Sequence, residues 1–368
     1  MIEDRHLDTV PKPDGLAVSP PRTTAPAPPA PRTRARRLPS VAVRVGLGLI
    51  VVLLALAGAG AMYEVVAAAQ DAAAYPPPGR LFDVGGHRLH ISCLGEGSPT
   101  VVFESGLANM SADWARVQAR VASTTRACAY DRAGIAWSES GPEPRDSLRI
   151  AGELHTLLGN AAIPSPYVLV GQSFGGLYVR VFADQYPDEV AGVVFADASH
   201  PDMWQRVEPG LTAAMIPSPG VGLAYRGLSH LGITRLTSTF PIDCGLDASQ
   251  CGQEGAWMTS ARQKDAFLAE MGAPERDAQV RASASLGARP LVVLTASNHA
   301  DIFGPVYVAQ TEPLWRQMQD ELADLSTNSV HLIVDGATHS SLQTKDAAVT
   351  SAAVEQVVQA ARYGERLK

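Results

Sequence analysis

The sequence predicts an α/β fold built on a mostly parallel, doubly wound sheet, and two observations carry this prediction. From residue 79 onward, short apolar runs of strand length alternate with segments whose apolar residues repeat with helical spacing. Several short runs, such as "YVLV" and "PLVVL", are almost continuously apolar, as strands buried on both faces should be. Repeated strand and helix units favour parallel strands covered by helices on both sides.

The predicted elements follow one another in regular order, except in one interval. Segments with helical periodicity include residues 150–161 and 177–186. Residues 199–289 are too long for a simple connection, so they are predicted to form a cap over the carboxyl ends of the strands. The strand runs are "HRLHISC", "TVVFESG", "TRACAYDRAG", "YVLVGQS", "AGVVFADAS", "PLVVLTAS" and "VHLIVDG".

The first 78 residues differ in composition from the rest. Residues 1–40 hold nine of the 27 prolines, so we expect a disordered arm. The uncharged stretch "VGLGLIVVLLALAGAGAM" follows at residues 45–62 and is just long enough to cross a bilayer. Residues 41–62 are therefore predicted to be a transmembrane anchor, residues 63–78 a linker, and residues 79–368 the globular domain.

The charges beside the apolar stretch predict its orientation. Arg32, Arg34, Arg36, Arg37 and Arg44 precede the stretch, which places the arm in the cytoplasm and the globular domain outside the cell membrane. A secretory signal peptide, whose cleavage would release a secreted protein, is the alternative interpretation. The long region before the apolar stretch favours the anchor.

Charge and cysteine content restrict the class of protein further. The net charge of -7 and the lack of a basic, aromatic patch in the globular part argue against nucleic-acid binding. Four cysteines fit an oxidising compartment. Cys244 and Cys251, seven residues apart, are expected to close a small disulfide loop, whereas Cys93 and Cys128 fall in predicted strands.

The motif "GQSFG" places Ser173 between Gly171 and Gly175. The pattern alone is weak evidence, but a strand run precedes it and a helical pattern follows it, as a nucleophile elbow requires. A serine becomes nucleophilic when a general base takes its proton. His339 follows the last strand after a turn-prone "DGAT" and is the predicted base; three other histidines (His155, His299 and His331) are weaker candidates.

Acyl transfer also needs N–H donors that hold the developing oxyanion. Gly106 follows the run "TVVFES" and allows a close approach of the backbone. The predicted donors are the backbone N–H groups of Leu107 and of Phe174, the residue after the serine.

With these motifs the chain resembles the α/β-hydrolase superfamily, especially its esterase-like and lipase-like serine hydrolases. The resemblance covers residue 80 to about residue 361 and implies an α/β-hydrolase fold with the cap after strand six. It departs from a common pattern at Glu104 and Gln172, where histidines often stand. The motifs are "ESG", "YDRAGIAWS", "GQSFGG", "VFADASHPD" and "GATHS".

The resemblance suggests two candidates for the acid that orients His339. Asp197 ends the strand that some members use for this acid, and Asp301 follows the next strand, which is the commoner place. Asp197 is preferred because Asp301 lies six residues beyond its strand. The strand order of the family also makes Cys93 and Cys128 neighbours that can pair.

Supporting roles are expected for several other residues. Asp131 and Arg132 are expected to hold the loop after their strand. Four large cap side chains are candidates for an acyl pocket, although plain packing is the alternative for each: Trp204, Met215, Trp257 and Met258.

Together these features predict a membrane-anchored serine hydrolase acting on a small-molecule carboxylic ester or acyl substrate. No cofactor or metal is implied, since no ligand cluster with suitable spacing occurs. An amidase, peptidase, thioesterase, acyltransferase or lyase on the same fold is the alternative within enzymes. A non-catalytic binding protein at the cell surface is the alternative outside them, and the oligomeric state stays open.

Overall fold

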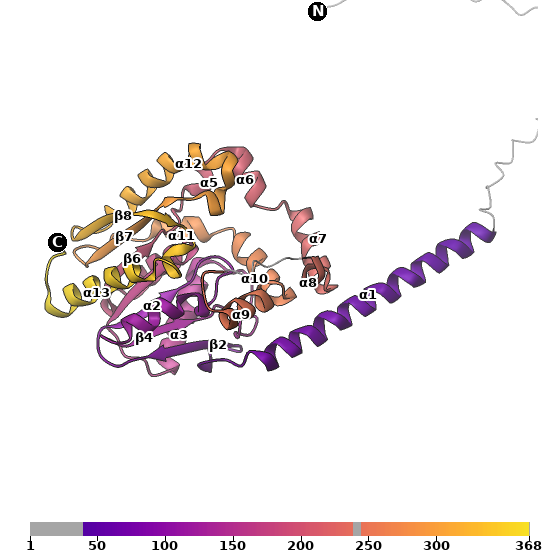
Figure 1. Cartoon of the computed structure of the whole chain (residues 1–368), viewed down its shortest axis with the longest axis horizontal. Coiled ribbons are helices and arrows are strands. Elements are labelled where there is room, and N and C mark those ends of the chain that lie inside the picture. The colour runs from indigo at the N-terminus through magenta and orange to yellow at the C-terminus, as the bar shows by residue number, and fades with distance from the viewer. Residues whose placement is uncertain (1–39, 238–243, 368) are drawn as a thin grey trace, which may run out of the picture. The chain divides into compact units, whose positions relative to one another are not determined.

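The computed structural model describes residues 40–237 and 244–367 (Figure 1). The chain divides into two compact units, Met1–Val51 and Val52–Lys368. The predicted disordered arm lies outside the described residues, apart from residue 40. Helix α1, Ser40–Ala74, begins in the first unit and continues into the second.

The second unit is organised around one sheet of eight strands in the order β1-β2-β4-β3-β5-β6-β7-β8. Strands β1, β2 and β4 pair in antiparallel fashion, and all other neighbours are parallel, which confirms the predicted mostly parallel sheet. Strand β1 was not predicted. The strands are β1 Arg80–Asp83, β2 Arg88–Leu94, β3 Thr100–Glu104, β4 Ala127–Tyr130, β5 Tyr167–Gln172, β6 Val190–Ala196, β7 Leu291–Asn298 and β8 Ser329–Thr338.

Helices cover both faces of the sheet. Successive residues of a strand point to opposite faces, so each strand contributes to two separate cores. Val168 and Val170 of β5 join one core with helices α2 and α13. Leu169, between them, joins the other core with α3, α4 and α12. The helices are α2 Ala115–Val121, α3 Ser147–Asn160, α4 Phe174–Gln185, α12 Ala300–Ala323 and α13 Ala347–Tyr363, with short 3-10 turns at Ser111–Trp114, Pro187–Glu189 and Ser341–Gln343.

The chain between β6 and β7 forms seven described helices, within the interval predicted as a cap. Both pairs of cysteines are bridged: Cys244 with Cys251 in this interval, and Cys93 with Cys128 on the adjacent strands β2 and β4. The helices are α5 Met203–Arg206, α6 Pro209–Met215, α7 Pro219–His230, α8 Ile233–Thr237, α9 Ala248–Met258, α10 Ala261–Met271 and α11 Arg276–Ala282.

Helix α1 is longer than the predicted anchor. Residues 63–74, predicted to be a linker, continue the helix, because they are rich in alanine, the residue with the highest helix propensity. Glu64 and Asp71 lie two turns apart and both bind Arg235 of α8, at 2.5 and 2.6 Å. Among the described residues, α1 is the one helix long and apolar enough to cross a membrane.

Candidate active site

Ser173 occupies a strained turn between β5 and α4. Its backbone has φ 51° and ψ -125°, a conformation that ordinary residues rarely adopt. A Cβ on Gly171 would lie 2.7 Å from the Gly175 oxygen, and one on Gly175 would lie 2.3 Å from the Glu104 oxygen. Both glycines are therefore required for the tight crossing of strand and helix, which presents the serine at the carboxyl edge of the sheet.

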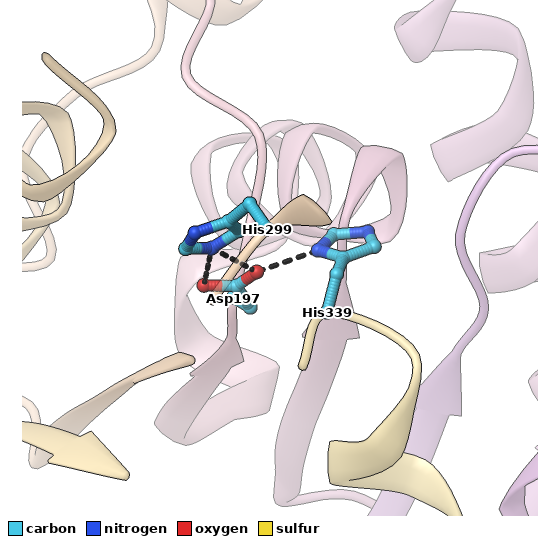
Figure 2. A group of neighbouring side chains, drawn as sticks. All are labelled: Asp197, His299 and His339. Carbon is cyan, nitrogen blue, oxygen red and sulfur yellow. Dashed lines mark hydrogen bonds and ion pairs between the residues drawn. The ribbon is translucent and has the colours of Figure 1, made fainter. Parts of the chain in front are cut away.

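His339 follows β8 at the same edge of the sheet. Its Nδ1 donates a hydrogen bond to Oδ2 of Asp197 at 2.5 Å (Figure 2). The side-chain amide of Gln172 lies 2.9 Å from the other ring nitrogen, Nε2. Because Nδ1 carries the proton that faces Asp197, Nε2 of neutral His339 accepts from this amide. In this structure the lone pair of Nε2 is therefore occupied by the amide of Gln172.

Asp197 is fully buried and receives hydrogen bonds from several sides. Besides His339, the backbone N–H of Ala296 and the indole N–H of Trp315 donate to its Oδ1, at 3.1 and 3.0 Å. Burial alone would raise the pKa of Asp197, but hydrogen bonds from His299 and His339 outweigh burial and hold this pKa below its usual range. The carboxylate is therefore ionised at neutral pH.

Asp301, the alternative acid, has a different neighbour. Its Oδ2 accepts a hydrogen bond from the backbone N–H of Ser340 at 3.0 Å. The side chain is exposed, and it holds the residue after His339 rather than the imidazole itself. The structure thus brings Asp197, and not Asp301, against the ring of His339.

A second histidine, His299, faces Asp197 from the side opposite His339 (Figure 2). Its Nε2 lies 2.9 Å from Oδ2 of Asp197, and its Nδ1 lies 2.9 Å from Oε2 of Glu312 on α12. A doubly protonated imidazole can donate one hydrogen bond to each of these two carboxyl groups. Burial would lower the pKa of His299, but the two carboxylates outweigh burial and raise it above its ordinary value of 6.5.

Sequence reasoning treated His299 as a weak candidate for the base and missed its contact with Asp197. The sequence signal was the position of His299 directly after β7. Asp197 and His339 also follow the ends of parallel strands, at the same edge of the sheet. Asp197, His299 and His339 form a described group whose ligand atoms lie within 4.8 Å of one another. In this structure the facing nitrogens donate protons to Asp197, so a metal ion would have to displace both protons.

His299→Gln tests the charged state of this second histidine. Because its pKa is raised in the folded protein, its contribution to stability is fully present below pH 6.5 and is lost as the pH rises through the folded-state pKa. We expect the variant to lose about 1.5–3 kcal/mol of unfolding free energy at pH 6, from one hydrogen bond to a charged group, and less at higher pH. Urea unfolding across this range, with exposed His230→Gln as the control, measures the difference. An equal loss at every pH would contradict the charged state.

The loop after β3 lies against the elbow and carries the predicted oxyanion donors. Leu107 and Phe174 line the same cavity as Ser173 and His339. Phe174 is the first residue of α4, so its N–H has no acceptor inside the helix. A Cβ on Gly106 would lie 2.3 Å from Oε1 of Gln172 and 3.0 Å from the Cβ of Ser173, so the backbone of this loop passes close to the elbow.

Arg132 binds the backbone of the loop that follows β3. Its guanidinium donates to the carbonyl oxygens of Ser105 and Gly106, at 2.6 and 2.8 Å. It also pairs with two buried carboxylates, Glu104 at 2.7 Å and Glu270 of α10 at 2.8 Å. Burial raises the pKa of Glu104 to about 7, against the opposing charge of Arg132 and a hydrogen bond from Tyr130. Arg132 therefore joins the loop after β3 to the cap.

The neighbouring Asp131 has a similar supporting position. It accepts a hydrogen bond from Nδ1 of His90 at 2.7 Å and one from the backbone N–H of Ser111 at 2.7 Å. These contacts agree with the structural role expected for Asp131 and Arg132. The partner Glu270 lies more than a hundred residues away in sequence and was not predicted.

Arg132→Met is expected to destabilise the fold strongly, because it leaves Glu104 and Glu270 buried without a counter-charge. The expected loss is about 3–5 kcal/mol of unfolding free energy. Urea unfolding of both proteins gives this value. Arg88→Met is the matched control, since Arg88 pairs with Glu139 at the surface and its loss should leave the unfolding midpoint nearly unchanged. Equal midpoint shifts in the two variants would refute the role given to Arg132.

The cavity at Ser173 has a volume of about 220 Å³. Trp204 and Met215, two of the expected pocket residues, line it. Trp257 lies elsewhere, packed against Trp137 with ring centroids 6.2 Å apart, and Met258 accepts a hydrogen bond from Gln263. Further apolar side chains of the cap and of helix α12 line the cavity: Met203, Met271, Ile302, Phe303 and Trp315.

Comparison with known sequences gives partial matches. A family model for the alpha/beta hydrolase fold matches residues 99–214. A probable transporter of Hormonema carpetanum is 32% identical over 158 residues, which cover 39% of this chain and 23% of that protein. An uncharacterized vacuolar membrane protein of Saccharomyces cerevisiae is 29% identical over 135 residues, which cover 32% of this chain and 21% of that protein. The chain thus spans about a quarter of the length of these relatives.

Solved structures match a larger part of the chain. A thermophilic esterase from Thermogutta terrifontis has a TM-score of 0.55 at 18% identity, and the alignment covers 76% of this chain and 97% of the esterase chain. An enol-lactonase from Burkholderia xenovorans LB400 has a TM-score of 0.54 at 19% identity and covers 76% of this chain and 100% of its own. At such identities the likeness establishes the fold, and the chemistry has to be argued from the site.

Proposed function

We propose that the chain is a member of the α/β-hydrolase superfamily, as the family-model match over residues 99–214 supports, and that it is a serine hydrolase that cleaves carboxylic esters through an acyl-enzyme intermediate. The observation that carries the proposal is the arrangement at one sheet edge. Ser173 stands on the strained elbow, His339 lines the same cavity, and Asp197 lies 2.5 Å from the far nitrogen of His339. These are the three groups that nucleophilic catalysis by serine needs.

In the first half of the proposed reaction, the hydroxyl oxygen of Ser173 attacks the carbonyl carbon while its proton passes to Nε2 of His339. The N–H groups of Leu107 and Phe174 hold the carbonyl oxygen as negative charge develops on it. His339 then gives the proton to the leaving alcohol as the carbon–oxygen bond breaks. In the second half, water attacks the acyl group by the same route and releases the carboxylic acid.

Two neighbours of His339 support these proton transfers. Asp197 holds the tautomer whose Nε2 is free to take a proton, and its charge stabilises the imidazolium that forms. Gln172 donates to Nε2 in the resting site, so its amide has to turn away when the serine transfers its proton. Oε1 of Gln172 is buried without a hydrogen-bond partner, which favours a side chain that can change its orientation.

The residue at the elbow argues against the carboxylate-nucleophile chemistry of some members of this superfamily. An amide, a thioester or an acyl acceptor other than water would use the same groups, and the preference among them belongs to the cap. The ester is favoured because its alcohol leaves more readily than an amine. No metal or organic cofactor enters this mechanism.

We propose further that α1 anchors the enzyme in the cell membrane with the catalytic unit outside. The length and apolar character of α1 support the anchor, and a relative described as a vacuolar membrane protein agrees with it. The arginines that precede α1 support the outward orientation, because positive charge is retained on the cytoplasmic side.

The proposal is tested by hydrolysis of p-nitrophenyl esters by the full chain in non-ionic detergent. We expect release of p-nitrophenol by the wild type and its loss in His339→Ala. A wild type that is folded by circular dichroism and inactive on every ester would reject ester hydrolysis. A non-catalytic binding protein would then be the better explanation.

A further inference from the structure

We propose that the esters hydrolysed here carry a long acyl chain, which leaves the catalytic cavity past Met215 and Met271 and lies in an apolar groove of the cap. This inference rests on the proposed ester hydrolysis and names its substrate class. We call the groove the α7–α10 groove, and its lining includes Ile216, Gly222, Leu223, Arg226, Leu268 and Met271.

The catalytic cavity by itself is small. Its volume of about 220 Å³ lies below the roughly 300–1,000 Å³ that is typical of pockets for drug-sized ligands. The ester group and a few carbon atoms fill such a space. A longer substrate therefore has to extend beyond the cavity, and its path depends on which wall can open.

Two methionines form the wall that leads to the α7–α10 groove. Met271 lines both the catalytic cavity and this groove. Met215 lines the catalytic cavity and also a third hollow, which shares Ile216 with the groove. Methionine side chains are unbranched and adapt readily to the shape of an apolar partner. Neighbouring spaces thus share lining residues, and the two methionines among them can adapt their shape.

The groove has the character that an acyl chain requires. Leu223 and Leu268 line it, and it has a volume of about 330 Å³. Its one charged residue, Arg226, is paired with Asp265 at 3.1 Å. Val221 and Leu223 of α7 are exposed by 59% and 73%, a large apolar surface for the first turns of one helix. An acyl chain in the groove would cover part of this surface.

The surroundings of α7 also fit a membrane-derived substrate. A Cβ on Gly60 of α1 would lie 2.5 Å from the oxygen of Leu231, just beyond the end of α7. A Cβ on Gly232 would lie 2.6 Å from the ring of Tyr63. The end of α7 therefore packs against the last turns of the apolar stretch at residues 45–62. Long-chain esters concentrate in bilayers, because each methylene adds to the free energy of partition.

The inference is tested by a substitution at Gly222 that places a large side chain in the α7–α10 groove. A Cβ on Gly222 would lie 3.7 Å from Cδ2 of Leu268, so the ring of Gly222→Phe should enter the groove. Hydrolysis of p-nitrophenyl decanoate and p-nitrophenyl butyrate by the full chain gives a ratio of kcat/KM values. We expect Gly222→Phe to lower this decanoate-to-butyrate ratio at least about tenfold. Leu223→Asp, at an exposed position, should lower the same ratio if the phenylalanine variant does not fold.

Gly227→Phe is the matched control, because it lies on the same helix and a Cβ there meets no atom within 4 Å. Its ratio should equal that of the wild type. An unchanged ratio in both folded groove variants, with activity that depends on Ser173, would overturn the long-chain inference alone. A folded wild type inactive on both esters would overturn the proposed function and this inference with it.

Discussion

Ser173→Ala is expected to reduce kcat for ester hydrolysis by about 10⁴- to 10⁶-fold, because it removes the atom that forms the acyl-enzyme. Alanine keeps the Cβ and the backbone of the elbow, so the fold and the cavity should remain. Initial rates with p-nitrophenyl butyrate, compared at equal concentrations of folded protein, give the ratio. The residual rate reports what the oxyanion donors contribute without a nucleophile.

The control for this variant is Ser123→Ala, which removes an exposed serine hydroxyl at the end of α2, away from the candidate active site. It should keep the wild-type rate and the wild-type thermal unfolding. Substantial activity in Ser173→Ala would show that another group attacks the ester, and the proposed mechanism would then be wrong.

Asp197→Asn is expected to reduce kcat by about 10³- to 10⁴-fold. Asparagine has nearly the same shape, but its neutral amide neither stabilises the imidazolium nor holds the tautomer of His339. The hydrogen bonds from Ala296 and Trp315 to Oδ1 can persist, which limits the structural damage. Steady-state kinetics with a soluble short-chain ester measure the loss.

Asp301→Asn is the matched control for the acid. Its side chain accepts a hydrogen bond from the backbone of Ser340, and the amide oxygen of asparagine can accept the same bond. We expect a rate close to that of the wild type. A larger loss in Asp301→Asn than in Asp197→Asn would transfer the role of the acid to Asp301.

The elbow at Ser173 could be predicted from the sequence because all of its signals lie close together in the chain. A β-branched run, "GQSFGG" and a helical pattern follow one another within about twenty residues, and the structure places the turn at Ser173 as expected. His339 was predicted as the base in the same way, from a turn that follows the last strand. Asp197 was preferred because it ends its strand directly, and its Oδ2 lies 2.5 Å from His339.

What the sequence did not reveal depends on contacts between distant segments. His299 and Glu312 come from the end of β7 and from α12, and only the folded chain brings them to Asp197. Glu270 reaches Arg132 across the boundary between cap and sheet. Strand β1 was missed because it has only four residues at the edge of the sheet, where neither length nor apolar character gives a strong signal.

The end of the N-terminal helix α1 was harder to predict than its apolar part. The uncharged apolar run at residues 45–62 indicated the apolar part of α1, but the helix continues through an alanine-rich segment to Ala74. Glu64 and Asp71 would be unremarkable in a linker, and their pairing with Arg235 of α8 depends on the cap. Apolar composition therefore predicted the start of the feature better than its end.

Covalent labelling shows whether Ser173 is an activated serine. The full chain is treated with a fluorophosphonate, which reacts with serine nucleophiles, and the modified peptide is identified by mass spectrometry. We predict one adduct, on Ser173, whose formation becomes much slower in His339→Ala. A folded protein that takes up no label, or takes it up at another residue, would contradict the account.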